Sequence, residues 1–245
     1  MSEADDRDEH ERGGREVEEI DRVREEFLRV AGHELRSPLT AMQLQIDTLI
    51  MAVQQSATTV GIEERAERIR RSLHKLGWII EEVLDLVRAG GGWLPLRAAE
   101  VDVVDLARHA IERFAHDLER AGCEARLVGA GEALGVWDGP RVEHALGSLL
   151  IAAVKSGPAT AIEIDIQIDE EGGARAEIRD GGAGLSPAQV ALVFQPFDRM
   201  LAGLQAGNPT LGLWLARMVA EAHGGRLVIA PGRHALHLPK TGRPP

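Results

Sequence analysis

The chain has 245 residues, 44% of them hydrophobic and 27% charged, which is enough to build one large domain or two modest ones around a core. A formal net charge of −11 and an aromatic content of 3%, with no tyrosine, argue against a nucleic-acid-binding surface, which needs a basic patch and rings for base stacking. The single cysteine, Cys123, excludes an internal disulfide, and no apolar run approaches the about 18 residues that a membrane helix requires.

The first 89 residues contain a charged tail and two helical patterns. Residues 1–15 are dense in charge and include Gly13-Gly14, which predicts disorder. From about Glu16 the pattern is helical, because Ile20, Val23, Phe27 and Val30 are spaced three, four and three residues apart, as on the packed face of a helix, and apolar positions continue to Val53. A turn is expected at residues 56–61, and a second helix at residues 62–88. The apolar seam of this second helix consists of Ile69, Leu73, Leu76, Ile80, Val83 and Val87.

Two long amphipathic helices joined by a short turn predict a helical hairpin over residues 16–89. A lone hairpin of this kind has too small a core to be stable. Pairing two hairpins into a four-helix bundle would bury both seams. We therefore expect a homodimer.

Gly90-Gly91-Gly92 marks the clearest domain boundary, because helical and strand patterns alternate after it. Helices are expected at residues 103–121, 141–155 and 211–223, with a shorter one from Pro187. Strands are expected at residues 124–128, 161–169, 175–179, 226–230 and 234–238. In residues 161–169 four isoleucines alternate with polar residues, which indicates a strand with one wet face. The expected fold class is α+β, a helical hairpin followed by a two-layer α/β sandwich over residues 93–240.

The most informative motif lies in the first helix and reads His33-Glu34-Leu35-Arg36-Ser37-Pro38-Leu39-Thr40. In the helical register His33 falls on the flank of the apolar seam, where another protein or domain could reach its imidazole. The carboxylate of Glu34 could accept a proton from one ring nitrogen and so make the other a better nucleophile. Attack on a phosphoryl group would then give a covalent phosphoramidate.

This motif resembles the phosphoacceptor box of two-component sensor histidine kinases, and the resemblance runs from about Glu16 to the C-terminus. It implies that His33 accepts phosphate and that Glu34 acts as the base. It also implies that Ser37 orients water for phosphatase chemistry, at a position where Thr or Asn is more usual.

The second half carries further motifs of the same family. Asp180-Gly181-Gly182-Ala183-Gly184 is similar to the family's Asp-x-Gly-x-Gly box. Chemically, the carboxylate of Asp180 can accept from an adenine amino group, and Gly182 and Gly184 let the backbone close around the base. Phe194-Gln195-Pro196-Phe197 resembles the family's phenylalanine box. The resemblance implies ATP as cofactor.

The sequence departs from the family at the asparagine box, residues 141–155. Both expected asparagines are replaced, by Ser148 and Ala152. The resemblance implies that residue 152 coordinates Mg²⁺, and an alanine methyl offers no lone pair, which puts Mg²⁺ binding in doubt. A substitute metal site using His144 and Ser148 is an alternative. Lys155 remains and could meet a phosphate.

The lid that follows is also altered. Where the family has Gly-x-Gly-Leu-Gly-Leu, this chain reads Asn208-Pro209-Thr210-Leu211-Gly212-Leu213, so that Gly212 is what remains of the phosphate cradle. Asn-Pro-Thr is a good conventional helix start. We expect Thr210 to be the N-cap, with its side chain competing with phosphate for the same N–H donors.

These residues predict a histidine kinase core that exchanges phosphate between His33 and a response-regulator aspartate, with weak or lost autokinase activity. The alternatives are an ATP-independent phosphotransferase or regulator phosphatase, and a non-enzymatic dimeric pseudokinase adaptor. The expected partners are a response-regulator receiver domain, a second copy of the chain and a separate sensor or kinase, with no nucleic acid and no membrane insertion. The expected location is the cytoplasm.

Overall fold

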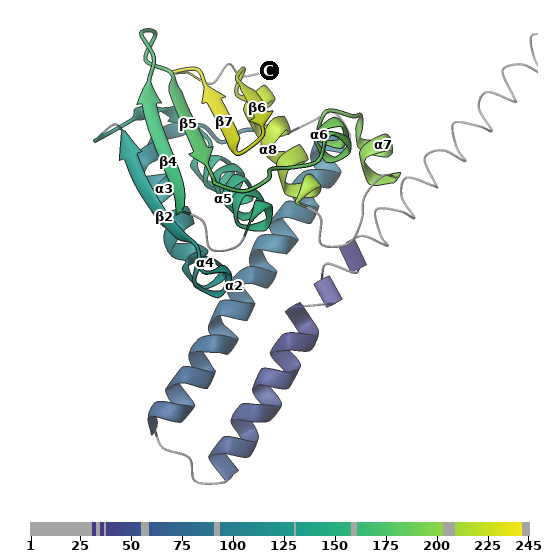
Figure 1. Ribbon diagram of the computed structural model, residues 1–245. Helices are drawn as coiled ribbons and strands as arrows, with labels where there is room; N and C mark the ends of the chain where they lie inside the picture. Colours follow the sequence, from purple (N-terminus) through teal and green to yellow (C-terminus); the bar gives the residue numbers. More distant parts are fainter. Residues whose placement is uncertain are drawn as a thin grey trace, which may run out of the picture. The chain divides into compact units, whose positions relative to one another are not determined.

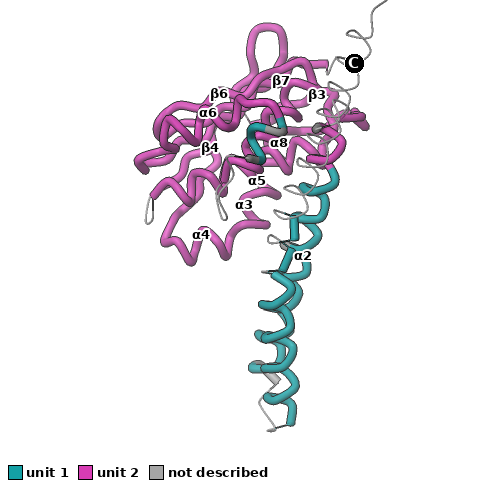
Figure 2. Tube along the Cα trace, turned by 90° about the vertical axis from the view of Figure 1, so that its right-hand side faces the viewer, with its two compact units in different colours: residues 1–84, 197–206 teal, residues 85–196, 207–245 magenta. Residues whose placement is uncertain are grey.

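The computed structural model describes residues 31–32, 35–36, 38–54, 59–90, 94–129, 131–157, 161–202 and 209–241. The chain divides into two compact units, which Figure 2 shows in different colours. The first unit comprises Met1–Leu84 and Phe197–Ala206, and the second comprises Asp85–Pro196 and Gly207–Pro245. The long helix α2, Thr59–Gly90, contributes residues to both, because the division falls between Leu84 and Asp85.

The first unit contains the predicted helical hairpin. Residues 38–54 form a helix that runs alongside α2 (Figure 1). Ser72 Oγ donates a hydrogen bond to Gln45 Oε1 at 2.9 Å and so joins the two helices. The same unit also holds the short helix α7, Phe197–Ala202.

The predicted apolar seam of α2 is only half covered in a single chain. Leu73, Ile80 and Val87 are exposed by 52%, 43% and 52%, although apolar side chains of this size are normally buried. Ile69, Leu76 and Val83 are partly buried. Half of the stripe therefore faces outward along one side of the helix.

The second unit is built on a mixed five-stranded sheet in the order β2-β4-β5-β7-β6. β2 and β4 pair in parallel, and the other neighbours pair antiparallel. The bounds of these strands are β2 Glu124–Gly129, β4 Ala161–Ile168, β5 Ala174–Arg179, β6 Arg226–Ala230 and β7 Arg233–Leu238.

Helices cover one face of this sheet, which confirms the predicted two-layer sandwich (Figure 1). α3, α5 and α8 pack against the strands, and the apolar core of Ile162, Ile164, Ile166 and Ile178 lies beneath them. No helix in the described ranges combines the length and apolar character needed to cross a membrane. The bounds of the helices in this unit are α3 Val103–Arg113, α4 Ala115–Ala121, α5 Gly139–Ser156, α6 Pro187–Val193 and α8 Thr210–Ala222.

Two local predictions differ from the structure. The helix predicted over residues 103–121 breaks at Phe114, where the backbone (φ −98°, ψ 10°) leaves the α-helical region and the side chain is 8% exposed. In addition, the short strands β1, Ala99–Asp102, and β3, Leu134–Trp137, form a separate antiparallel pair. Four residues each are too few to give a clear alternating pattern.

The face of the sheet opposite the helices was predicted to be polar and exposed to solvent, but it buries two carboxylates in ion pairs. Ile168, predicted to lie on the buried face, is 48% exposed at the end of β4, whereas Asp165 is 8% exposed. Asp165 Oδ2 accepts a hydrogen bond from Arg179 Nη2 at 2.9 Å. Glu177, at 2% exposure, accepts from Arg175 and Arg179. These guanidinium groups pair with the carboxylates that the strands bury.

Candidate functional site

The predicted catalytic residues His33, Glu34 and Ser37 lie outside the described residues. The described positions around them, residues 31–32, 35–36 and 38–54, are helical. Thr40 Oγ1 donates to the carbonyl oxygen of Arg36 at 2.9 Å, one helical turn earlier. The placement of His33 on the flank of the helix stays a prediction.

Asp180 stands directly after β5 and is fixed by the loop that it opens. Its Oδ1 accepts a hydrogen bond from the Gly182 N–H at 2.8 Å, and its own N–H donates to the carbonyl of Gly232 at 3.0 Å. The Asp180 side chain is 0% exposed, and Oδ2 has no hydrogen-bond partner among the described residues. A buried carboxylate with one oxygen held and the other unpaired suits the predicted acceptance of a bond from an amino group.

The glycines of this loop are required by close packing. A Cβ on Gly182 would lie 2.6 Å from the carbonyl carbon and oxygen of Ser156, the last residue of α5. Gly184 has a φ of +72°, and a Cβ there would lie 3.1 Å from Pro231 Cα and Gly232 N. The loop is therefore held between the end of α5 and the β6–β7 turn.

Lys155 and Gly212, predicted to lie on the phosphate side, come from two helices that pack against each other, α5 and α8. Lys155 is exposed in the last turn of α5, next to the Ser156 that contacts the Asp180 loop. Gly212 is partly buried in the first turn of α8. The roles of Lys155 and Gly212 as phosphate contacts stay predictions.

One face of α5 carries the altered asparagine box. His144, Ser148 and Ala152 are 6%, 7% and 0% exposed, and Ala152 presents only its methyl group. Burial lowers the pKa of His144 to about 3, although the Asp85 carboxylate acts in the opposite direction, so the imidazole is neutral at neutral pH. Among the described residues, no three His, Cys, Asp or Glu side chains cluster to hold a metal ion. The residues present do not fit Mg²⁺ at position 152.

The prediction that Thr210 caps α8 is wrong. The N-cap is Pro209, with φ −70° and ψ −4°, and its carbonyl accepts the first helical hydrogen bond from Leu213 N at 3.1 Å. The fixed φ of proline suits a helix start, so α8 begins one residue earlier and Thr210 becomes its first residue, 0% exposed. The N-cap residue makes no side-chain cap bond, so the expected competition between a threonine cap and phosphate is not present.

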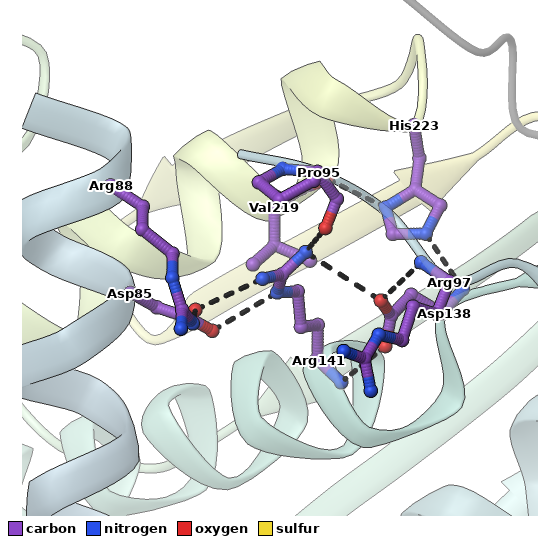
Figure 3. A network of polar contacts seen from close by, with 8 residues as sticks. All are labelled: Asp85, Arg88, Pro95, Arg97, Asp138, Arg141, Val219 and His223. Carbon is purple, nitrogen blue, oxygen red and sulfur yellow. Dashed lines mark hydrogen bonds and ion pairs between the residues drawn. The ribbon is translucent and has the colours of Figure 1, made fainter. Parts of the chain in front are cut away.

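Arg141, at the start of α5, ties together several segments of the second unit (Figure 3). Its Nε and Nη2 donate to the two carboxylate oxygens of Asp85, both at 3.0 Å, and Nη1 donates to the carbonyl of Pro95. The side chains of Arg141 and Asp85 are 12% and 15% exposed. Burial would raise the pKa of Asp85, but hydrogen bonds from Arg141 and then Arg88 outweigh it and lower this pKa.

Asp138 extends this network to α8 (Figure 3). It caps α5 through a hydrogen bond from Arg141 N to Oδ1 at 3.3 Å, and Oδ2 accepts from Arg97 N at 2.7 Å. The Asp138 N–H donates to His223 Nε2 at 2.9 Å, so His223 Nδ1 carries the proton and donates to the Val219 carbonyl at 2.7 Å. Burial lowers the pKa of His223 and favours this neutral form.

The sequence motifs did not reveal this network. Asp138, followed by Gly139-Pro140, has the pattern of a capped helix start and could have been found from it. Arg141 gave no local signal, because its partner Asp85 lies 56 residues away. His234, a buried residue of β7 whose Nε2 lies 3.9 Å from Asp180 Oδ2, also escaped notice.

Two known families match the chain over separate ranges. Residues 23–92 match the family described as the His Kinase A (phospho-acceptor) domain. Residues 137–241 match the family described as histidine kinase-, DNA gyrase B-, and HSP90-like ATPase. The first range contains the His33 motif, and the second contains the Asp180 loop and α8.

The chain is also similar to proteins named as sensor proteins and histidine kinases. The chain is 28% identical over 220 residues to the alginate biosynthesis sensor protein KinB of Pseudomonas aeruginosa, covering 88% of this chain and 36% of that relative. It is 26% identical over 226 residues to the signal transduction histidine-protein kinase/phosphatase MprB of Mycolicibacterium vanbaalenii, covering 87% and 46%. The chain thus spans less than half the length of these relatives. The solved structure of Acinetobacter baumannii histidine kinase AdeS shares the fold, with a TM-score of 0.54 at 18% identity, covering 85% of this chain and 98% of that one.

Proposed function

We propose that this chain, which belongs to the two-component histidine kinase family, exchanges phosphate between His33 and an aspartate of a response-regulator receiver domain. In this proposal the His33 imidazole attacks the phosphorus of the aspartyl phosphate, the P–O bond to the aspartate breaks and releases its carboxylate, and Glu34 takes the ring proton. The match of residues 23–92 to a phosphoacceptor domain supports this assignment.

We further propose that the chain phosphorylates itself from ATP slowly or not at all. The observation that carries this proposal is Ala152, which is completely buried on α5 and offers a methyl group where the family has a metal-binding asparagine. Without that oxygen ligand, Mg²⁺ would lose an anchor and the phosphate charges would be less well neutralised. The altered lid does not add to this proposal, because Thr210 is not the N-cap of α8.

The base side of the site fits an adenine nucleotide better than the phosphate side does. Asp180 Oδ2 is buried and unpaired among the described residues, and Gly182 and Gly184 let the loop lie close. Asp180, Gly182 and Gly184 would hold the base, and Lys155 would meet a phosphate. When bound, ATP would supply the phosphoryl group for His33.

We also propose that the chain works as a homodimer. The exposed side chains Leu73, Ile80 and Val87 recur along α2 and leave an apolar stripe uncovered in a single chain. A second copy of the hairpin would cover this stripe, since a four-helix bundle buries two faces of each helix pair. Analytical ultracentrifugation at micromolar concentration should give twice the mass of one chain, and a monomer would contradict the proposal.

The central test compares two sources of phosphate. We expect little label on the protein from labelled Mg-ATP and efficient label from a phosphorylated receiver domain, with both signals lost in His33→Ala. Rapid labelling of the wild type from Mg-ATP would contradict the weak-kinase proposal.

A pair of neighbouring substitutions sharpens this test. Ala152→Asn should raise labelling from ATP because it restores an oxygen ligand for Mg²⁺. Ala153→Asn is the matched control, because Ala153 is equally buried on the same helix. If both variants fold, as judged by circular dichroism, and both leave ATP labelling at the wild-type level, Ala152 is not the cause.

A second candidate activity is removal of phosphate from the receiver. The relative MprB is named a kinase/phosphatase, and Ser37 occupies the position that orients water in the family. Ser37→Ala should then slow phosphate release from a phosphorylated receiver without slowing its transfer to His33. Equal release rates in both proteins would remove this candidate.

A further inference from the structure

Two buried side chains of the second unit, Asp180 and His234, face each other without completing a hydrogen bond. Both side chains are 0% exposed, and His234 Nε2 lies 3.9 Å from Asp180 Oδ2. An N–H···O hydrogen bond spans about 2.7–3.2 Å. Asp180 Oδ2 and both ring nitrogens of His234 have no hydrogen-bond partner among the described residues. Buried polar atoms are nearly always paired, so this cluster points to a bound molecule that supplies the missing partners.

The gap between the two side chains is fixed by the sheet. His234 lies opposite Ile178 of β5 and opposite Ile229 of β6, so strands hold its backbone on both sides. Asp180 follows Ile178 by two residues, and its Oδ1 is held by Gly182 N–H. Because neither backbone can slide, Oδ2 and Nε2 stay 3.9 Å apart, and a flat ligand edge that lies alongside both atoms would meet each of them.

The chemistry of the pair selects a particular ligand edge. Burial lowers the pKa of His234, while Asp180 acts in the opposite direction, so the ring is neutral at neutral pH and one nitrogen donates while the other accepts. A carboxylate acceptor beside an imidazole N–H donor complements a ring that carries a donor and an acceptor on adjacent atoms. Adenine has this arrangement in its 6-amino group and N1, and guanine has the reverse.

We propose that His234 is a second base-reading residue, with His234 Nε2–H donating to N1 of adenine while Asp180 Oδ2 accepts from the 6-amino group. This inference rests on the proposed function in one respect, the assignment of the Asp180 loop as the base site. It requires no phosphate transfer and no metal ion. Recognition at the base end should therefore persist for ADP in the presence of EDTA.

The test is a binding cycle with the full chain, using calorimetry in EDTA. The probes are ADP and 1-deaza-ADP, which replaces N1 by a C–H group and leaves the phosphates unchanged. The variants are His234→Phe, which removes both ring nitrogens, and His234→Gln, which keeps an amide N–H near the position of Nε2. His237→Phe is the matched control. His237 follows His234 by three residues in the same strand, and because side chains alternate along a strand it lies on the opposite face of the sheet.

Wild type should bind 1-deaza-ADP about three- to tenfold more weakly than ADP, as expected for one hydrogen bond. His234→Phe should lose a similar factor for ADP and should no longer distinguish the two probes. His234→Gln should keep part of the distinction, and His237→Phe should behave as wild type.

Three results would overturn the inference: a wild type that binds neither probe, a wild type that binds both equally, and a folded His234→Phe that distinguishes them as wild type does. The first two do not depend on any variant folding. Rapid autophosphorylation from Mg-ATP would instead remove the weak-kinase proposal and leave the probe distinction untouched. Equal binding of the probes, with phosphate transfer from the receiver intact, would remove this inference alone.

Discussion

Replacing Arg141 by methionine should destabilise the second unit by about 2–3 kcal/mol. Removing one partner of a fully buried ion pair costs about 3–5 kcal/mol, because the other charge is left without compensation. The value should be lower here, since Asp85 is 15% exposed and keeps a hydrogen bond from Arg88 at 2.9 Å. Asp85→Asn should cost less, about 1–2 kcal/mol, because Arg141 retains the Pro95 carbonyl and Asp138.

The measurement is urea unfolding followed by tryptophan fluorescence, since Trp137 and Trp214 are both buried in the second unit. A double-mutant cycle should give a coupling of about 1 kcal/mol or more between Arg141 and Asp85. Arg126→Met is the control, because its ion pair with Glu124 is 69% exposed on both sides and should contribute less than about 0.5 kcal/mol.

Two outcomes would refute this reasoning. One is a coupling energy near zero, which would mean that the Arg141–Asp85 bonds do not form in solution. The other is an equal loss in Arg141→Met and Arg126→Met, which would mean that loss of a positive charge is the cause rather than the network at the start of α5.

Three further predictions concern acid stability, assembly and the Asp180 loop. Between pH 7.5 and pH 5, wild type should lose about 2 kcal/mol more stability than His144→Gln. The His144 imidazole has a pKa of about 6.5 in the unfolded chain and about 3 in the folded one, so the unfolded chain gains a proton first and stability falls as the pH drops through this window. Equal losses in the two proteins would contradict the assignment. Ile80→Glu should halve the mass seen by ultracentrifugation, whereas Glu81→Gln should not, because Ile80 lies on the exposed apolar stripe. Gly182→Ala should cost about 1–3 kcal/mol and weaken ADP binding, since its Cβ would lie 2.6 Å from the backbone of Ser156, and an unchanged melting temperature would argue against this packing.

The sequence predicted those parts of the fold that local periodicity controls. The isoleucine alternation of residues 161–169 gave β4 to within one residue, and the apolar spacing of residues 62–88 lies within α2. The Asp180 motif was recognisable because the glycine spacing reflects a real packing need, the contact of Gly182 with Ser156.

Other features depend on contacts between distant residues and left no local signal. The bend at Phe114 and the pairing of β1 with β3 come from tertiary packing rather than propensity. Thr210 was misread because the preceding proline also starts a helix well. His234 was invisible because its significance arises only when the sheet places it beside Asp180.

The position of β7 in the sheet has a consequence for folding during synthesis. This strand is translated after β2, β4, β5 and β6, yet it lies between β5 and β6 in the finished sheet. Until β7 emerges from the ribosome, one edge of β5 has no partner and the nascent second unit exposes an open strand.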